Sequence, residues 1–143
     1  TVPERRAPAS ILFMCGMNAV RSPMAEALAR QAIPESFVAS AGVRVGSRDP
    51  FVDAVLKEDG LDLGNRQPHT IEDLEDLFFD LIVTLSPEAH HRALELTRSL
   101  AVEVEYWPTP DPAAATGTRE QIVAAYRDVR DRLRKRIATR FAR

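Results

Sequence analysis

The sequence predicts a single α/β domain, spanning residues 1–143, in which a parallel sheet carries helices on both faces. Three observations support this prediction. The chain has 143 residues, 45% of them hydrophobic and 28% charged, as is usual for one soluble domain. Short apolar runs typical of buried strands alternate with longer segments of helical periodicity. Such alternation favours a parallel sheet, because a helix normally makes the crossover between parallel strands.

The first half of the chain contains two expected strands and two expected helices. The apolar run that begins at Ile11 ends at Gly16, which fits a short buried strand. Ser22 followed by Pro23 is a helix start signal, and Gly60 is a stop signal. The expected elements are, in order, a strand over Ile11–Cys15, a helix over Pro23–Ala32, a strand over Phe37–Val43 and a helix over Phe51–Asp59.

The second half continues the alternation and ends in a long helix. Asp80–Leu85 is the clearest strand, because β-branched and leucine residues follow one another without a break. The segment Pro108–Gly117 is the one long loop. The other expected elements are helices over Ile71–Leu77, Pro87–Leu100 and Thr118–Phe141 and a strand over Val102–Trp107. The last helix has an apolar stripe formed by Ile122, Tyr126, Val129, Leu133, Ile137 and Phe141.

Composition and charge exclude several classes of protein. The 19 basic and 21 acidic residues give a net charge of −2, which argues against a nucleic-acid partner. The longest stretch without a charge, Ala7–Val20, is too short to span a membrane. Residues Thr1–Ser10 are polar and rich in proline, without the apolar core of a signal peptide, so we expect a cytoplasmic protein. Cys15 is the one cysteine, which excludes an intrachain disulfide.

The loop after the first strand carries the strongest functional signal. Ligands of parallel sheets bind beyond the carboxyl ends of the strands, where Cys15 lies. Backbone N–H groups at the start of a helix bind anions and favour a nucleophilic thiolate. Asn18 tolerates the left-handed backbone of a tight cradle, and the planar fork of Arg21 suits a tetrahedral oxyanion. The expected anion-binding residues are Gly16, Met17, Asn18, Ala19, Val20 and Ser22. The alternative is an inert buried cysteine beside an arginine that happens to begin a helix.

The residues of this loop carry a resemblance to a known family. ILFMCGMNAVRSPMAEAL, residues 11–28, is similar to the signature of the low-molecular-weight protein tyrosine phosphatases, a family that includes thioredoxin-coupled arsenate reductases. Ser40-Ala41-Gly42, Asp80–Leu85 and Asp111-Pro112 resemble further motifs of the family in the same order. The resemblance implies a four-stranded parallel sheet flanked by helices and a mechanism through a phosphocysteine.

A thiolate that attacks phosphorus needs an acid to protonate the departing oxygen. Asp111 lies in the long loop after an expected strand, and Pro112 favours an extended backbone there. The resemblance implies that Asp111 is this general acid; the alternative is a simple turn. It also implies that a serine and a second polar side chain brace the central asparagine of the loop. Ser40 and Asn65 are the expected pair, with His69 as a rival to Asn65, and ordinary surface roles are the alternative.

The sequence departs from both branches of this family. After the Asp-Pro pair, tyrosine phosphatases typically have an aromatic residue that forms one wall of the substrate cleft. This sequence has Ala113, Ala114 and Ala115 there instead, so Tyr106 or Trp107 would have to form that wall. Val20 stands where many members have a second cysteine within the loop. Ser86 occupies the region of the first additional cysteine of the thioredoxin-coupled reductases, and no cysteine follows. Their internal thiol relay is therefore excluded.

Three functions follow, in order of preference. The first is a phosphomonoester hydrolase in which Cys15 attacks, Arg21 clamps the oxyanion and Asp111 is the acid; its substrate is a phosphorylated protein or a small phosphomonoester. The second is a single-cysteine arsenate reductase or arsenate–thiol transferase that uses a small external thiol. The third is an idle oxyanion-binding module. No cofactor is expected. No metal is expected either, because the adjacent His90 and His91 point apart on a helix and make a poor metal pair.

Overall fold

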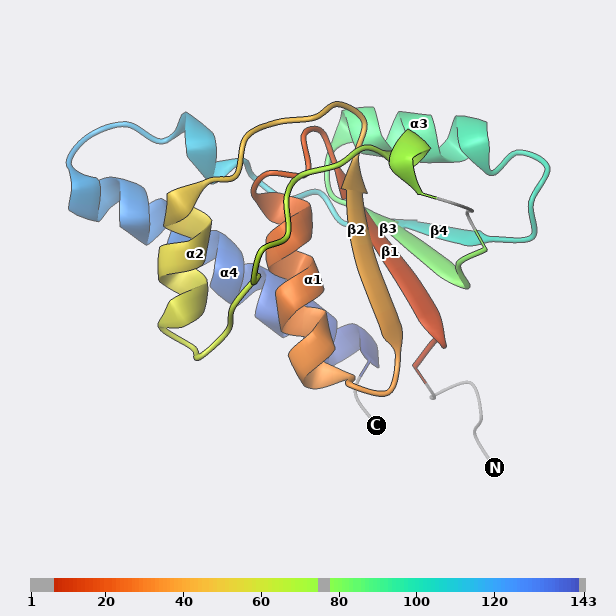
Figure 1. Cartoon of the computed structure of the whole chain (residues 1–143), viewed down its shortest axis with the longest axis horizontal. Helices are drawn as coiled ribbons and strands as arrows, with labels where there is room; N and C mark the ends of the chain where they lie inside the picture. Colours follow the sequence, from red (N-terminus) through yellow and green to blue (C-terminus); the bar gives the residue numbers. More distant parts are fainter. Residues whose placement is uncertain (1–6, 75–77, 142–143) are drawn as a thin grey trace.

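The structure, a computed structural model, describes residues 7–74 and 78–141 and contains one parallel sheet (Figure 1). The strands are β1 (Ser10–Cys15), β2 (Phe37–Gly42), β3 (Leu81–Thr84) and β4 (Glu103–Tyr106), in the spatial order β2-β1-β3-β4. Every neighbouring pair is parallel. The expected four-stranded parallel sheet is confirmed.

In the described residues, four α-helices and two short 3₁₀ turns lie between and after the strands. The helices are α1 (Arg21–Ala32), α2 (Pro50–Lys57), α3 (Pro87–Leu96) and α4 (Arg119–Phe141), and the 3₁₀ turns are η2 (Ile71–Asp73) and η3 (Pro112–Ala114). Asp49 caps α2 by accepting a hydrogen bond from the N–H of Phe51, and Ser86 caps α3 in the same way. In both helices a proline follows the cap, where its fixed φ suits the first turn.

The two faces of the sheet are covered by different helices (Figure 1). Side chains alternate along β1, so Ile11 and Phe13 face one side and Leu12 and Met14 face the other. The first side forms one core with α1, α2 and α4, to which Met24, Leu28, Val55, Val129 and Leu133 belong. The second side packs against α3 through Ala89 and Ala93. Helices therefore cover both faces, as the sequence predicts.

Two expected helices differ most from the structure, while the bounds of the other elements shift by at most two residues. The segment 71–74 forms the 3₁₀ turn η2 and then an extended residue, because Thr70 and Asp73 cap each other's backbone and close the turn early. Residues 75–77 of that expected helix lie outside the described residues, as do residues 1–6 of the polar N-terminal segment. Helix α3 ends at Leu96 instead of Leu100, since the Thr97 hydroxyl donates back to the Ala93 carbonyl and its backbone leaves the helical region.

The parallel arrangement brings the carboxyl ends of all four strands to one edge. The segments that leave this edge are residues 16–20, 43–49, 85–86 and 107–118. Ligands of such sheets bind at this edge. In the described part of the chain, no helix combines the length and the apolar character needed to cross a membrane.

Candidate active site

The loop between β1 and α1 is a tight turn that the segment after β2 holds in place. Asn18, in the middle of the loop, has a φ of 54°. The carbonyls of Cys15, Gly16 and Met17 accept hydrogen bonds from the backbone N–H groups of residues 43, 44 and 46, at 3.3, 2.8 and 3.0 Å. A β-carbon on Gly42 would lie 2.7 Å from the Asn18 nitrogen, so glycine is needed where β2 approaches the loop.

Cys15 lines an open pocket of about 640 Å³. The residue is 2% exposed, and its Sγ lies 3.0 Å from the Ser22 Oγ. The pocket is lined by Cys15, Gly16, Met17, Ala19, Val20, Arg21, Arg44, Ser47, Asp49, Ser86, Pro87, Glu88, Asp111 and Ala113. The structure thus brings Asp111, which is distant in sequence, to the same pocket as Cys15 and Arg21.

Arg21 and Asp111 face each other across this pocket. The Arg21 Nη1 donates to the Thr109 carbonyl at 3.0 Å, and its Nη2 lies 3.9 Å from the Asp111 Oδ2. The Arg21 side chain is only 15% exposed, whereas that of Asp111 is 47% exposed. Asp111 also accepts from the N–H of Ala113 at 3.0 Å, which fixes the start of η3. An arginine fork and a carboxylate are therefore both within reach of an anion in the pocket.

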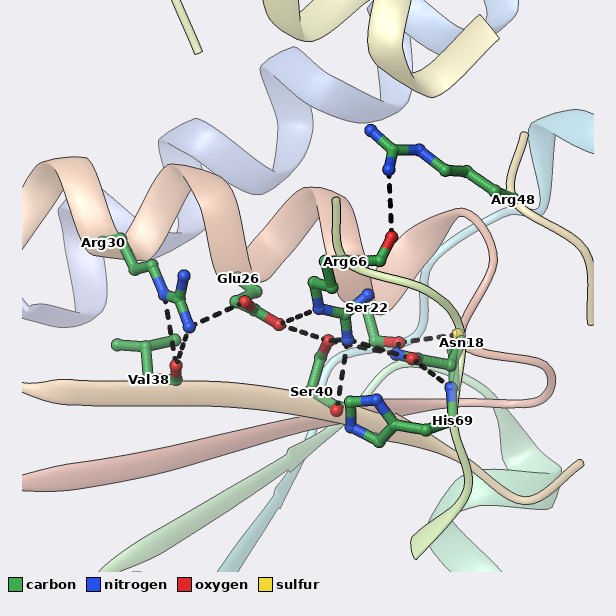
Figure 2. Close-up of polar contacts among 10 residues, drawn as sticks. Asn18, Ser22, Glu26, Arg30, Val38, Ser40, Arg48, Arg66 and His69 are labelled. Carbon is green, nitrogen blue, oxygen red and sulfur yellow. Dashed lines mark hydrogen bonds and ion pairs between the residues drawn. The ribbon is translucent and has the colours of Figure 1, made fainter. Parts of the chain in front are cut away.

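A buried hydrogen-bond network supports the loop from behind, and Figure 2 shows its members. The Asn18 Nδ2 donates to the Ser22 Oγ at 2.9 Å and to the Ser40 Oγ at 3.0 Å. The Asn18 Oδ1 accepts from the Arg66 Nη2 at 2.9 Å and from the backbone N–H of His69 at 3.0 Å. Asn18, Ser22 and Ser40 are fully buried. Ser40 therefore lies where the sequence predicts it, in contact with the central asparagine.

The structure does not place Asn65 in this network. Its side chain is exposed, and its neighbour Arg66 reaches the loop instead. Arg66 also pairs with the buried Glu26 at 3.1 Å. Burial lowers the pKa of the Arg66 guanidinium, while the attraction of Glu26 acts in the opposite direction. His69 contributes its backbone N–H and not its ring. Nothing in the sequence pattern distinguishes Arg66 from the other arginines, since its role depends on the long reach of its side chain.

Charged residues and no aromatic ones surround the mouth of the pocket among the described residues. Arg44 and Glu88 form a bidentate ion pair at 3.1 and 2.9 Å, which raises the pKa of Arg44. Trp107 is 2% exposed in the core, and Tyr106 stacks on the ring of His90. Neither ring lines the pocket, so they do not replace the aromatic wall that the sequence lacks.

Asp49 is held at the pocket by Tyr126. The Tyr126 hydroxyl donates to the Asp49 Oδ2 at 2.6 Å. Burial raises the pKa of Tyr126 above its usual value, and the hydrogen bond to the Asp49 carboxylate acts in the same direction.

Within residues 7–74 and 78–141, no group of three or more His, Cys, Asp or Glu side chains is arranged to hold a metal ion.

Solved structures with similar folds include phosphatases. The tyrosine phosphatase AmsI of Erwinia amylovora superposes with a TM-score of 0.75 at 23% identity, covering 94% of this chain and 91% of that one. The YwlE arginine phosphatase of Geobacillus stearothermophilus has the same TM-score of 0.75 and identity of 23%, covering 91% of this chain and 88% of that one. At this level of identity the likeness concerns the fold.

Closer relatives in sequence are named arsenate reductases. The arsenate reductase of Bacillus subtilis is 34% identical over 130 residues, covering 89% of this chain and 91% of the relative. That of Halalkalibacterium halodurans is 35% identical over 130 residues, covering 90% and 92%. The sequence profile of the low molecular weight phosphotyrosine protein phosphatases matches residues 10–142, and the chain therefore belongs to this family of phosphatase-like enzymes.

Proposed function

We propose that the protein is a phosphomonoester hydrolase that acts through a phosphocysteine intermediate, on a phosphorylated protein or a small phosphomonoester. The observation that supports this most is the common pocket of Cys15, Arg21 and Asp111 at the carboxyl edge of the sheet. The N-terminus of α1 and the backbone N–H groups of the loop supply the positive field that a phosphate dianion requires.

The first step transfers the phosphoryl group to sulfur. The Cys15 thiolate attacks phosphorus, an S–P bond forms, and the bond from phosphorus to the leaving oxygen breaks. Asp111 gives its proton to that oxygen as it departs. The Arg21 fork, which rests on the Thr109 carbonyl in the free protein, turns its donors to the equatorial oxygens, where negative charge spreads in the transition state.

The second step returns the enzyme to its starting state. The Asp111 carboxylate takes a proton from a water molecule, whose oxygen attacks phosphorus. The S–P bond breaks, inorganic phosphate leaves, and Cys15 is again a thiolate. The Ser22 Oγ, 3.0 Å from the sulfur, stabilises the thiolate as a leaving group.

Substitution of the nucleophile tests this proposal. Wild-type protein should hydrolyse an aryl phosphate, and Cys15→Ser should show no turnover above background, because a serine hydroxyl is not ionised in this field. The variant should keep its unfolding temperature and still bind inorganic phosphate, as measured by calorimetry. Hydrolysis that survives in Cys15→Ser would exclude the mechanism.

Arsenate reduction is the second candidate, and two observations favour it. Relatives named arsenate reductase are 34% and 35% identical, and the pocket has no aromatic wall among its described residues. Cys15 is the one cysteine of the sequence, so two external thiols would have to be oxidised to a disulfide as As(V) is reduced to As(III). Arsenate-dependent thiol consumption, assayed with several small thiols, tests this candidate; no consumption with any of them would reject it.

An idle oxyanion-binding module is less well supported. That function would require Asp111 to lie far from Cys15, whereas both line the same pocket.

A further inference from the structure

We propose that Glu88 is a specificity-determining residue, because it neutralises Arg44 at the mouth of the pocket. The pocket then selects a phosphomonoester whose leaving group carries a cation close to the phosphate, and it disfavours a leaving group with a second anion. The inference rests on the proposed function and narrows its substrate class. Neither Arg44 nor Glu88 takes part in the two steps of the proposed reaction.

Arg44 and Glu88 meet beside the loop that carries the nucleophile. Arg44 lies in the segment after β2, and its backbone N–H donates to the Gly16 carbonyl at 2.8 Å. Glu88 lies in the first turn of α3. A β-carbon on Gly16 would lie 3.0 Å from the Glu88 Oε1 and 3.8 Å from the Arg44 Nη2. The ion pair therefore joins two segments of the sheet edge directly over the residue that follows Cys15.

This ion pair occupies the second cation of the pocket. The lining contains two arginines and three carboxylates, which are Arg21, Arg44, Asp49, Glu88 and Asp111. Arg21 serves the phosphate in the proposed reaction. Glu88 accepts from the Nε and the Nη2 of Arg44, at 3.1 and 2.9 Å, and so holds one whole edge of the guanidinium. A second phosphate or a carboxylate on the leaving group would have to compete with Glu88 for Arg44.

Asp49 adds negative charge to the same pocket. Its Oδ2 accepts from the Tyr126 hydroxyl at 2.6 Å, and its Oδ1 accepts from the backbone N–H of Phe51 at 2.9 Å. Both donors are neutral, so they hold the carboxylate in place without cancelling its charge. Once the phosphate occupies Arg21, the complement of the remaining charges is an ammonium or guanidinium group on the substrate. Such complementarity contributes specificity by penalising like charges.

Two aryl phosphates that differ in one charged substituent test the selection. They are 3-(aminomethyl)phenyl phosphate, which carries an ammonium group, and 3-carboxyphenyl phosphate, which carries a carboxylate. Wild-type protein should have a KM about threefold to tenfold lower for the ammonium ester, as expected for partly exposed charges. The ratio of kcat/KM for the ammonium ester to that for the carboxylate ester is then compared among variants, which cancels the different intrinsic reactivity of the two esters.

Substitution of either partner should shift this ratio in opposite directions. Glu88→Gln frees the Arg44 guanidinium, so the ratio should fall by about threefold to tenfold, mainly through a lower KM for the carboxylate ester. Arg44→Gln leaves the Glu88 carboxylate without its partner, so the ratio should rise by a similar factor. A loss of structure would impair both esters and could not produce shifts of opposite sign.

Glu72→Gln is the matched control, because Glu72 forms an exposed ion pair with Arg92 at 2.6 Å and lies outside the lining of the pocket. Its ratio should equal that of wild type. Thermal unfolding curves should show that all three variants are folded.

Peptides distinguish the two sources of such a substrate. A phosphotyrosine peptide with lysines beside the phosphorylated residue is compared with the same peptide carrying glutamates. A preference for the lysine peptide that falls in Glu88→Gln would assign the recognised cation to neighbouring side chains of a phosphorylated protein. A preference confined to the two aryl esters would assign it to a small phosphomonoester.

Two results would overturn the proposal. These are a ratio that stays at the wild-type value in both Glu88→Gln and Arg44→Gln, and a shift of the same sign in both. If wild-type protein hydrolyses neither ester, the proposed function fails. The corresponding benzylphosphonates, which cannot be hydrolysed, then test the role of Glu88 by calorimetry, since their Kd ratio should shift in the same opposite directions.

Discussion

Asn18 adopts a left-handed backbone, with a φ of 54°, and its side chain is fully buried. Such a conformation is costly for most residues, although asparagine tolerates it better than others. Here four hydrogen bonds to the side chain offset that cost, two at the amide nitrogen and two at the oxygen. The shape of the loop therefore depends as much on what lies behind it as on the residues that face the pocket.

Asp111→Asn should impair hydrolysis most for substrates whose leaving oxygen must be protonated in order to depart. We expect kcat/KM for an alkyl phosphate to fall by about 10²–10⁴, the usual contribution of a general acid, and to fall much less for a nitrophenyl phosphate. The second step also loses its base, so a phosphocysteine should accumulate and be detectable by rapid quench and mass spectrometry.

Asp128→Asn serves as the control, since Asp128 is an exposed carboxylate paired with Arg132 on α4. In Asp128→Asn, the ratio of kcat/KM for the alkyl phosphate to that for the nitrophenyl phosphate should equal the wild-type ratio. Equal losses for alkyl and nitrophenyl phosphates in Asp111→Asn would assign Asp111 a role in binding and not in proton transfer.

The sequence predicts the pocket residues better than the residues behind them. Cys15 and Arg21 belong to one short loop, so local spacing is enough to relate them. Asn18 and Arg66 are 48 positions apart, and Arg21 and Thr109 are 88 apart. No periodicity encodes such contacts. The sequence led to Asn65, with His69 as a rival, and not to Arg66, because a loop of irregular backbone does not show which of two adjacent side chains turns inward.

At the scale of elements, ion pairs join α2 to α4. Glu58, at the end of α2, accepts hydrogen bonds from Arg127 at 2.7 and 3.0 Å and from Arg130 at 2.7 Å. Arg130 is 7% exposed in its side chain and also donates to the Val55 carbonyl. These bonds fix the end of α2 to the middle of α4, and both helices pack with α1 in one hydrophobic core.

The Glu58 ion pairs predict a specific dependence of stability on pH. The hydrogen bonds from Arg127 and Arg130 lower the pKa of Glu58 to about 2, from its ordinary value of 4.5. Because the folded value is the lower one, its contribution is complete above about pH 4.5 and is lost as pH falls toward 2. Wild-type protein should therefore unfold at a higher temperature than Glu58→Gln at neutral pH, and the difference should vanish toward pH 2.

Salt and a second carboxylate provide the checks on this prediction. Glu58 is exposed enough for 1 M NaCl to reduce the difference in unfolding temperature. Glu120→Gln, at an exposed carboxylate in the first turn of α4, should show no comparable change across this range of pH. A difference between wild type and Glu58→Gln that persists undiminished at pH 2 would indicate packing and not charge.

An unbroken run of apolar residues predicted its element reliably, whereas apolar residues spaced along a short segment did not. Leu81, Ile82 and Val83 follow one another in β3, which forms a central strand and is buried at all its positions. The seven residues Ile71–Leu77 also have apolar spacing, yet the described part of them forms only a 3₁₀ turn. A helix of two turns gains little from its own hydrogen bonds, so the reciprocal caps of Thr70 and Asp73 decide the local structure.

At the scale of the whole molecule, the parallel topology creates the site. The alternation of strands and helices predicts that all carboxyl ends share one edge, and this alone relates Cys15 to Asp111 before any contact is known. The order β2-β1-β3-β4 places the loop that follows β1 between those that follow β2 and β3. The depth of the pocket and the charges at its mouth depend on side-chain packing, which the pattern of hydrophobic residues does not specify.

The oxidation of Cys15 depends on the composition of the whole chain. Cys15 opens onto the pocket, and the sequence holds no second cysteine. Peroxide should convert the thiolate to a sulfenic acid, which a neighbouring thiol would normally capture as a disulfide. Val20, where a resolving cysteine stands in many relatives, cannot do so. Oxidation should therefore proceed to the sulfinic and sulfonic acids, visible by mass spectrometry. Dithiothreitol added early should restore activity, dithiothreitol added late should not, and phosphate in the pocket should slow the loss. Full recovery after prolonged peroxide would show that another group protects the sulfur, such as a backbone nitrogen that forms a sulfenamide.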